Sequence, residues 1–272
     1  MVELQKSTRA RKALGQHFLR DRRYLGPMLQ AASLTAEDTV VEVGPGTGVL
    51  TEALIGQARR VVAVELDPYL AETLRQRFAG VANLEVVVGD AREAAPEELL
   101  GRREPYKVVA NLPYYAATPI LRRFLEASHK PQLLVVMIQR EVAQQMVAPP
   151  GKRSLLSVAT QFYGQPRVVA LVPPGAFRPP PKVTSAIVSI RVFPQPAVEV
   201  DSVEGFFAVV RGGFSAPRKQ LRNALHYGLG LSPAQSEALL HSAGVLPTRR
   251  AETLTLEEWA ALYRASRPES GC

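Results

Sequence analysis

From Thr39 onward the chain alternates short β-branched runs with amphipathic segments, and this alternation limits its fold more than any other feature. Five apolar runs are predicted strands, at 39–43, 60–64, 84–88, 107–111 and 133–138. Segments with helical spacing lie between or after them, at 49–57, 69–78, 120–127 and 141–147. Strands that alternate with helices form a mainly parallel sheet covered on both faces. A doubly wound α/β domain is therefore predicted.

Two later strand-like runs, 167–172 and 185–193, have no long helix between them. They are predicted to lie at one sheet edge as an antiparallel hairpin, which brings the sheet to seven strands. Pro194, Gln195 and Pro196 then mark a stiff linker, and helical patterns replace strands after it. We expect a first domain over residues 1–193, with a basic segment at 1–23, and a small α-helical domain over 194–272.

Composition and charge exclude several classes of protein. Hydrophobic residues make up 46% of the 272, and no apolar run is long enough to span a bilayer. Residues 1–12 are basic and lack the apolar core of a secretory signal. The single cysteine, Cys272, rules out internal disulfides and a cysteine-ligated zinc site. We expect a cytoplasmic monomer with no metal and no membrane association.

The net charge of +8 favours a polyanionic partner. Charge alone leaves two kinds of partner open, nucleic acid and a membrane surface.

A glycine-rich turn follows the first predicted strand. Residues 44–48 read GPGTG, and alternate glycines let a backbone turn sharply and approach a ligand closely. The fingerprint of dinucleotide-binding proteins requires glycine where this chain has Val49. A nucleotide-type cofactor is therefore predicted at Gly44 and Gly46, with a nicotinamide oxidoreductase as a minor alternative.

Carboxylates follow the next two predicted strands. Glu65 ends one strand and has the spacing at which a carboxylate meets ribose hydroxyls, while Asp90 follows the other and suits an adenine amino group. Either residue alone is more typical of a surface loop. Because open α/β sheets bind ligands at the carboxyl ends of their strands, the coincidence favours a nucleoside ligand.

The motif Asn111-Leu112-Pro113-Tyr114 follows a further apolar strand and suits amino methylation of adenine. The exocyclic nitrogen is a poor nucleophile, and two acceptors, the Asn111 side-chain oxygen and the Leu112 carbonyl, would hold its hydrogens and aim its lone pair. Pro113 fixes the turn, and Tyr114 offers a stacking face for a base lifted out of RNA. Phe177 is predicted to close over the base from the other side, although its proline-rich segment is equally typical of a surface loop.

Taken in order, these residues resemble a known family. The runs LGQHFL at 14–19, EVGPGTG at 42–48, NLPY at 111–114, FRPPPKV at 177–183 and LRNAL at 221–225 are similar to the KsgA family of small-subunit ribosomal RNA adenine dimethyltransferases, over essentially the full length. The resemblance implies a Rossmann-like, seven-stranded domain that uses S-adenosylmethionine. It also implies methylation of two adjacent adenosines in a hairpin near the 3′ end of 16S ribosomal RNA, in the small subunit or its precursor.

The resemblance assigns roles to individual residues. Contacts with S-adenosylmethionine are implied for His17, Leu19, Gly44, Glu65, Asp90 and Asn111. The base-holding groups are implied to be Asn111 to Tyr114 and Phe177. The chain departs from the family at His17, where asparagine is usual, and at 214–219, which is less densely basic.

The resemblance implies that residues 1–193 form the catalytic domain and that the helical domain over 194–272 recognises RNA. Basic residues near both ends are predicted to contact RNA phosphates. They are Arg9, Arg11, Lys12, Arg20, Arg22, Arg23, Arg218, Lys219 and Arg222. Two further alternatives remain open: a large-subunit (23S) adenine methyltransferase of the antibiotic-resistance type, and a ribosome-assembly factor that binds RNA.

Overall fold

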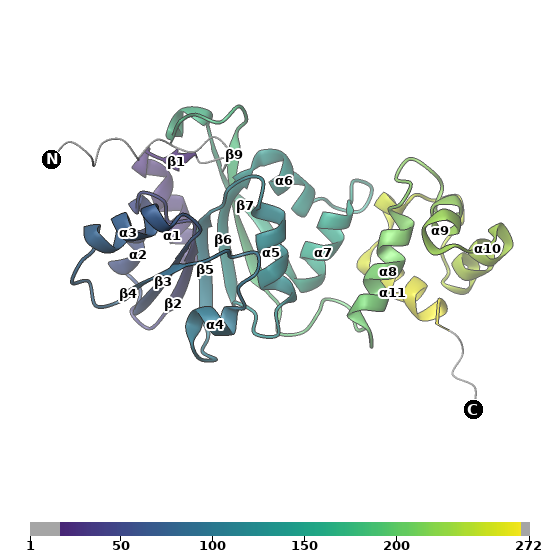
Figure 1. Ribbon diagram of the computed structural model, residues 1–272. Coiled ribbons are helices and arrows are strands. Elements are labelled where there is room, and N and C mark those ends of the chain that lie inside the picture. The colour runs from purple at the N-terminus through teal and green to yellow at the C-terminus, as the bar shows by residue number, and fades with distance from the viewer. Residues whose placement is uncertain (1–16, 268–272) are drawn as a thin grey trace. The chain divides into compact units, whose positions relative to one another are not determined.

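A computed structural model describes residues 17–267, and Figure 1 gives their arrangement. The chain divides into two compact units. The first comprises Met1–Ala143 and Gln165–Val192, and the second comprises Gln144–Gly164 and Phe193–Cys272. Between residues 17 and 267, every helix is too short or too polar to cross a membrane.

The first unit contains a seven-stranded sheet in the order β4-β3-β2-β5-β6-β9-β7. The strands are β2 (Thr39–Val43), β3 (Arg60–Glu65), β4 (Leu84–Val88), β5 (Tyr106–Asn111), β6 (Leu133–Gln139), β7 (Gly164–Val172) and β9 (Ser185–Val192). Neighbouring strands from β4 to β6 pair in parallel, and β9 pairs antiparallel with β6. These findings confirm the predicted doubly wound, seven-stranded fold.

The strand register brings the functional motifs to one edge of the sheet. All five residues of β2 are buried, as expected for a central strand covered on both faces. Val43 lies opposite Val64, and the Gly44 amide donates to the Val64 carbonyl at 2.9 Å. Glu65 lies opposite Val88, at the end of β4. The turns after β2, β3 and β4 therefore begin at nearly the same level.

Helices cover both faces of this sheet, the first of them before β2 and the others between later strands, and Figure 1 shows α1, α2 and α3 on one side of the sheet and α5 on the other. They are α1 (Leu25–Ala32), α2 (Val49–Ile55), α3 (Pro68–Arg77), α4 (Pro96–Leu100), α5 (Ala117–Glu126) and α6 (Arg140–Met146). Helix α1 was not predicted, because Gly26 and Pro27 resemble turn signals. Proline is tolerated in a first helical turn, and Met28 and Ala32 are fully buried.

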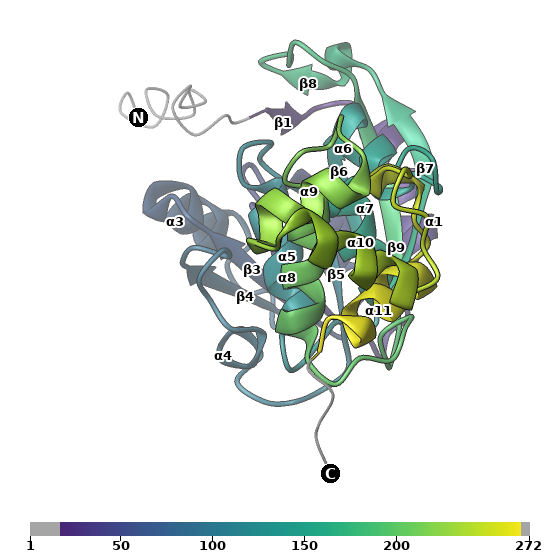
Figure 2. The ribbon, with the colours of Figure 1, turned by 90° about the vertical axis from the view of Figure 1, so that its right-hand side faces the viewer.

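A short two-stranded sheet joins two distant motifs. Strand β1 (Phe18–Leu19) pairs antiparallel with β8 (Phe177–Arg178), so that Leu19 lies opposite Phe177 (Figure 2). The amides of Arg20 and Asp21 also donate to the Ala176 carbonyl, at 2.8 and 3.1 Å. This pairing places the residues that follow position 16 beside the proline-rich segment.

The second unit is helical. It contains α7 (Leu155–Tyr163), α8 (Val203–Gly213), α9 (Leu221–Leu229), α10 (Pro233–Ser242) and α11 (Leu256–Ala265). The Phe162 ring stacks on Phe206 at 4.9 Å and meets the edge of Phe207 at 5.2 Å. These contacts explain why α7 belongs to this unit although it precedes β7 and β9. The domain boundary after residue 193 stays a prediction.

Candidate active site

An open cleft lies at the carboxyl ends of the central strands. Its empty volume, open solvent included, is about 800 Å³. Of the predicted site residues, His17, Gly44, Gly46, Glu65, Asp90 and the whole Asn111–Tyr114 motif line it. Residues from five separate segments of the chain therefore meet at one site.

The glycine-rich loop adopts a backbone conformation that other residues rarely take. Gly44, Gly46 and Gly48 have φ angles of 67°, 54° and 79°. A Cβ atom built on Gly46 would lie 2.8 Å from the Phe18 ring. A side chain at position 46 would therefore both strain the loop and displace Phe18 from the cleft wall.

Glu65 is held in the cleft by backbone amides. Its Oε2 accepts from the Gly46 amide at 3.1 Å, and its Oε1 accepts from the Asp67 amide at 3.0 Å. The residue is only 5% exposed, and burial raises the pKa of its carboxyl group. The loop and strand β3 thus fix this carboxylate in one orientation beside Gly46.

A second carboxyl group, Glu42, lies inside the sheet beneath the loop. It is 1% exposed, its Oε2 accepts from the Thr51 hydroxyl at 2.6 Å, and burial raises its pKa to about 8. We therefore expect Glu42 to be mainly protonated at neutral pH. Sequence analysis did not predict this protonated state, because Glu42 lies within an otherwise apolar strand.

Asp90 has a partner that the sequence did not suggest. Arg92 donates to it through its amide at 2.9 Å, through Nε to both carboxylate oxygens at 3.0 Å, and through Nη2 at 2.5 Å. These hydrogen bonds lower the pKa of the Asp90 carboxyl group. Arg92 also lines the cleft.

The Asn111 side chain is oriented by the segment that precedes β1. Its Nδ2 donates to the His17 carbonyl at 3.2 Å. Because an amide nitrogen is donor-only and its oxygen acceptor-only, this bond commits the nitrogen and leaves Oδ1 as an acceptor at the other end of the group. The adjacent Leu112 amide donates to the Met137 carbonyl at 3.1 Å, which fixes the backbone of the motif.

Tyr114 is half-buried and held at both its ring and its hydroxyl. The hydroxyl lies 2.5 Å from Ser185 Oγ, and burial raises the pKa of the phenol. The His17 ring lies 5.5 Å from the Tyr114 ring, and His17 Nδ1 is 2.8 Å from the Pro179 carbonyl. Since a carbonyl only accepts, His17 Nδ1 carries the proton. His17 thus contacts both ends of the Asn111–Tyr114 motif: its carbonyl accepts from Asn111 and its ring lies beside that of Tyr114.

Two predicted site residues lie elsewhere. Phe177 is 4% exposed and packs in the hydrophobic core with Leu19. Among the described residues, neither Leu19 nor Phe177 lines the large cleft. Leu19 instead lines a smaller cavity, together with Glu42 and Gly44. The closing of Phe177 over a base stays a prediction.

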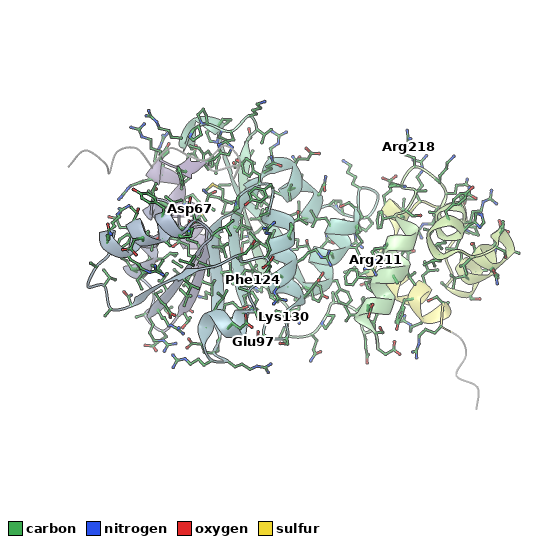
Figure 3. The ribbon with its side chains drawn as sticks, in the orientation of Figure 1. Asp67, Glu97, Phe124, Lys130, Arg211 and Arg218 are labelled. Carbon is green, nitrogen blue, oxygen red and sulfur yellow. The ribbon has the colours of Figure 1, made fainter. Side chains whose placement is uncertain are left out.

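The predicted RNA contacts differ in their surroundings. Arg22 pairs with Glu52 at 2.7 Å, Arg23 pairs with Asp21, two residues earlier, at 2.7 Å, and Arg222 pairs with Glu237 at 2.8 Å. Arg20, Arg218 and Lys219 are exposed, and Figure 3 shows Arg218 directed away from the helices of its unit. Arg9, Arg11 and Lys12 lie outside the described residues.

The fold and the cleft together define a Rossmann-like methyltransferase. A model of the family described as "Ribosomal RNA adenine dimethylase" matches residues 7–266. The chain belongs to this family.

Relatives and solved structures agree with this assignment. "Ribosomal RNA small subunit methyltransferase A" of Dehalococcoides mccartyi is 51% identical over 93% of this chain and 87% of its own. The protein of the same name from Geobacter metallireducens is 44% identical over 94% of this chain and 95% of its own. The 23S rRNA methyltransferase ErmE is 31% identical, with a TM-score of 0.71 over 91% of this chain and 98% of its own. A dimethyladenosine transferase from Plasmodium falciparum shares the fold. It is 23% identical, with a TM-score of 0.73 over 90% of this chain and 96% of its own.

Proposed function

We propose that this protein transfers methyl groups from S-adenosylmethionine to the N6 amino groups of two adjacent adenosines, near the 3′ end of 16S ribosomal RNA. The products are dimethyladenosines, and a role in small-subunit maturation follows. The observation that carries the proposal is the orientation of Asn111, whose nitrogen is committed to His17 and whose oxygen remains an acceptor in the cleft.

The residues of the cleft fit S-adenosylmethionine. When bound, this cofactor supplies a methyl group on a positively charged sulfur. Glu65 retains acceptor capacity on a carboxylate fixed by two backbone amides, which suits a ribose diol. Asp90 suits the adenine amino group, and Gly46 and Phe18 both line the cleft, with no room for a side chain at position 46. His17 and Leu19 are the further proposed contacts.

The base would be held by the Asn111–Tyr114 motif. The Asn111 Oδ1 and the Leu112 carbonyl accept the two amino hydrogens and orient the nitrogen lone pair. Tyr114 stacks on the base, and its hydroxyl contact with Ser185 keeps the ring in place. Catalysis by this motif is mainly positioning, which can lower a barrier by several kcal/mol.

The choice of small-subunit RNA is supported by the relatives. Those named for the small subunit are 51% and 44% identical to this chain, whereas the 23S enzyme ErmE is 31% identical. The basic residues of the helical unit, notably Arg218 and Lys219, suit phosphate contacts that position the RNA. We further propose that the protein acts as a cytoplasmic monomer.

One assay tests the proposal against its nearest alternative. Small and large ribosomal subunits that lack adenine dimethylation would be incubated with the protein and S-adenosylmethionine labelled in its methyl group, and the labelled base would be mapped. The proposal expects label on N6 of two adjacent adenosines of 16S RNA. Label confined to 23S RNA would favour the large-subunit alternative, and no label on either would favour an RNA-binding assembly factor.

A further inference from the structure

Arg92 takes up the acceptor capacity of the Asp90 carboxylate. A carboxylate has about four lone-pair positions. Arg92 fills both oxygens through its amide, its Nε and its Nη2, in four hydrogen bonds of 2.5 to 3.0 Å. A ligand N–H group that approaches Asp90 must therefore displace part of the guanidinium.

Glu65, the other carboxylate of the cleft, differs in this respect. The bonds to its carboxylate oxygens come from the Gly46 and Asp67 amides, at 3.1 and 3.0 Å, and backbone amides hold the group without neutralising it. Of these two carboxylates, Asp90 is the one paired with a cationic side chain. The competition between a ligand and an internal donor is thus specific to the Asp90 end of the cleft.

The Asp90–Arg92 pairing is favoured by local geometry. Asp21 and Arg23, in a different loop, have the same spacing and the same set of bonds, from the amide, Nε and Nη2 of the arginine. Because the same arrangement occurs at a site outside the large cleft, we attribute it to the local backbone and expect the Asp90–Arg92 pair in the ligand-free protein. The Arg92 side chain is 42% exposed and that of Asp90 is 18% exposed, so the guanidinium can turn into solvent while the carboxylate stays in the cleft.

We propose that Arg92 determines cofactor affinity by competing with the adenine amino group for the Asp90 carboxylate. This inference rests on the proposed function, in which Asp90 binds adenine. Cofactor and demethylated product share the same adenosine, so Arg92 weakens the binding of both. The consequence is faster release of the product, S-adenosylhomocysteine, at the cost of a higher cofactor requirement.

Calorimetric titration of the full chain with S-adenosylhomocysteine tests this competition. The variants are Arg92→Leu, Asp90→Asn and the double variant. Arg92→Leu keeps the amide bond to Asp90 at 2.9 Å, so the turn remains ordered. Arg122→Leu is the matched control, because Arg122 pairs with Glu126 on α5 at 2.9 Å, with side-chain exposures of 58% and 37%. We expect Arg92→Leu to tighten binding up to about fivefold, a small effect because the ion pair that it removes is exposed.

Two further comparisons, in the Asp90→Asn background and at higher salt, test whether the effect of Arg92→Leu depends on its pairing with Asp90. The gain from Arg92→Leu should vanish in the Asp90→Asn background, because the competition needs the carboxylate. Higher salt should tighten binding to the wild type, because it screens the pair, and leave Arg92→Leu nearly unchanged. An Arg92→Leu variant that binds no tighter, or a gain that persists without Asp90, would overturn the inference and leave the proposed function intact. A wild-type protein that binds no S-adenosylhomocysteine would instead refute the proposed function, and the inference with it.

Discussion

The orientation of the Asn111 amide links the two halves of the proposed chemistry. Its nitrogen donates to the His17 carbonyl, from the segment that precedes β1, while its residue stands at the end of β5. The segment implied to contact the cofactor therefore also positions the group implied to hold the base. A change at Asn111 should affect methyl transfer far more than cofactor binding.

Asn111→Ala removes the side-chain acceptor for the adenine amino group. We expect kcat for methyl transfer to fall by about 100-fold or more, because misplacement of a reacting group has an effect of that size. The thermal unfolding midpoint, measured by circular dichroism, should stay close to that of the wild type. A variant with near-normal kcat would contradict the assignment of Asn111 to the base.

Tyr114 offers a pair of variants that separate stacking from hydrogen bonding. Tyr114→Phe loses the contact with Ser185 Oγ but keeps the aromatic face, whereas Tyr114→Ala loses both. Since base stacking contributes about 1–3 kcal/mol, we expect Tyr114→Ala to lower kcat/KM for RNA about 10- to 100-fold and Tyr114→Phe to lower it much less. Equal losses in single-turnover assays would argue against stacking.

Glu42 predicts a pH dependence of stability. Its pKa in the folded protein is about 8, above the ordinary value of 4.5, so the folded state keeps a proton that the unfolded state loses. This contribution is fully present below pH 4.5 and is lost as the pH rises toward 8. The free energy of unfolding should fall by up to about 1.4 kcal/mol per pH unit in this window. In Glu42→Gln, urea titrations between pH 5 and 8 should show a shallower fall, and an unchanged slope would contradict a buried neutral Glu42.

At the scale of elements, the hydrophobic periodicity of the sequence predicted the strands whose carboxyl ends form the cleft. All seven strands of the main sheet were expected, because each reads as a short run rich in β-branched residues. The β1–β8 pairing was not expected, because each strand has only two residues and the partners are about 160 positions apart. Arg92 was also missed, since an exposed arginine after a strand carries no local signal of its bonds to Asp90.

Close packing of α8 against α9 depends on glycine. A Cβ built on Gly228 would lie 2.3 Å from the Gly212 carbonyl oxygen, which is backbone and cannot rotate away. We expect Gly228→Ala to lower the free energy of unfolding by about 1–3 kcal/mol, as overpacking does. Gly26→Ala in α1 is the control, because nothing lies within 4 Å of that position, and it should raise stability by up to about 1 kcal/mol. A denaturant titration in which the free energy of unfolding changes in the same direction in both variants would contradict this packing account.

At the scale of the whole molecule, the net charge of +8 suits a polyanionic substrate, and the distribution of exposed cations decides where RNA binds. Arg22, Arg23 and Arg222 are partly neutralised by carboxylates. Arg218 and Lys219 are exposed between α8 and α9. We therefore expect the latter pair to contribute more to RNA affinity.

The salt dependence of RNA binding tests this expectation. Arg218→Ala/Lys219→Ala should reduce the slope of log K against log salt by about 1.8, at about 0.9 per lost phosphate contact. Arg264→Ala/Arg267→Ala removes the same formal charge from α11 and the residues after it, and should change the slope much less. Equal changes in the two double variants, measured by filter binding, would show that only net charge matters.

The central claim is that the cleft at the strand ends brings a nucleoside cofactor next to Asn111. A crystal structure of the protein soaked with S-adenosylhomocysteine tests it directly. We expect the ribose hydroxyls within hydrogen-bond distance of Glu65, the adenine amino group near Asp90, and the sulfur beside the Asn111–Tyr114 motif. Density for the nucleoside elsewhere, or an Asn111 side chain turned into the hydrophobic core of the occupied protein, would contradict the account.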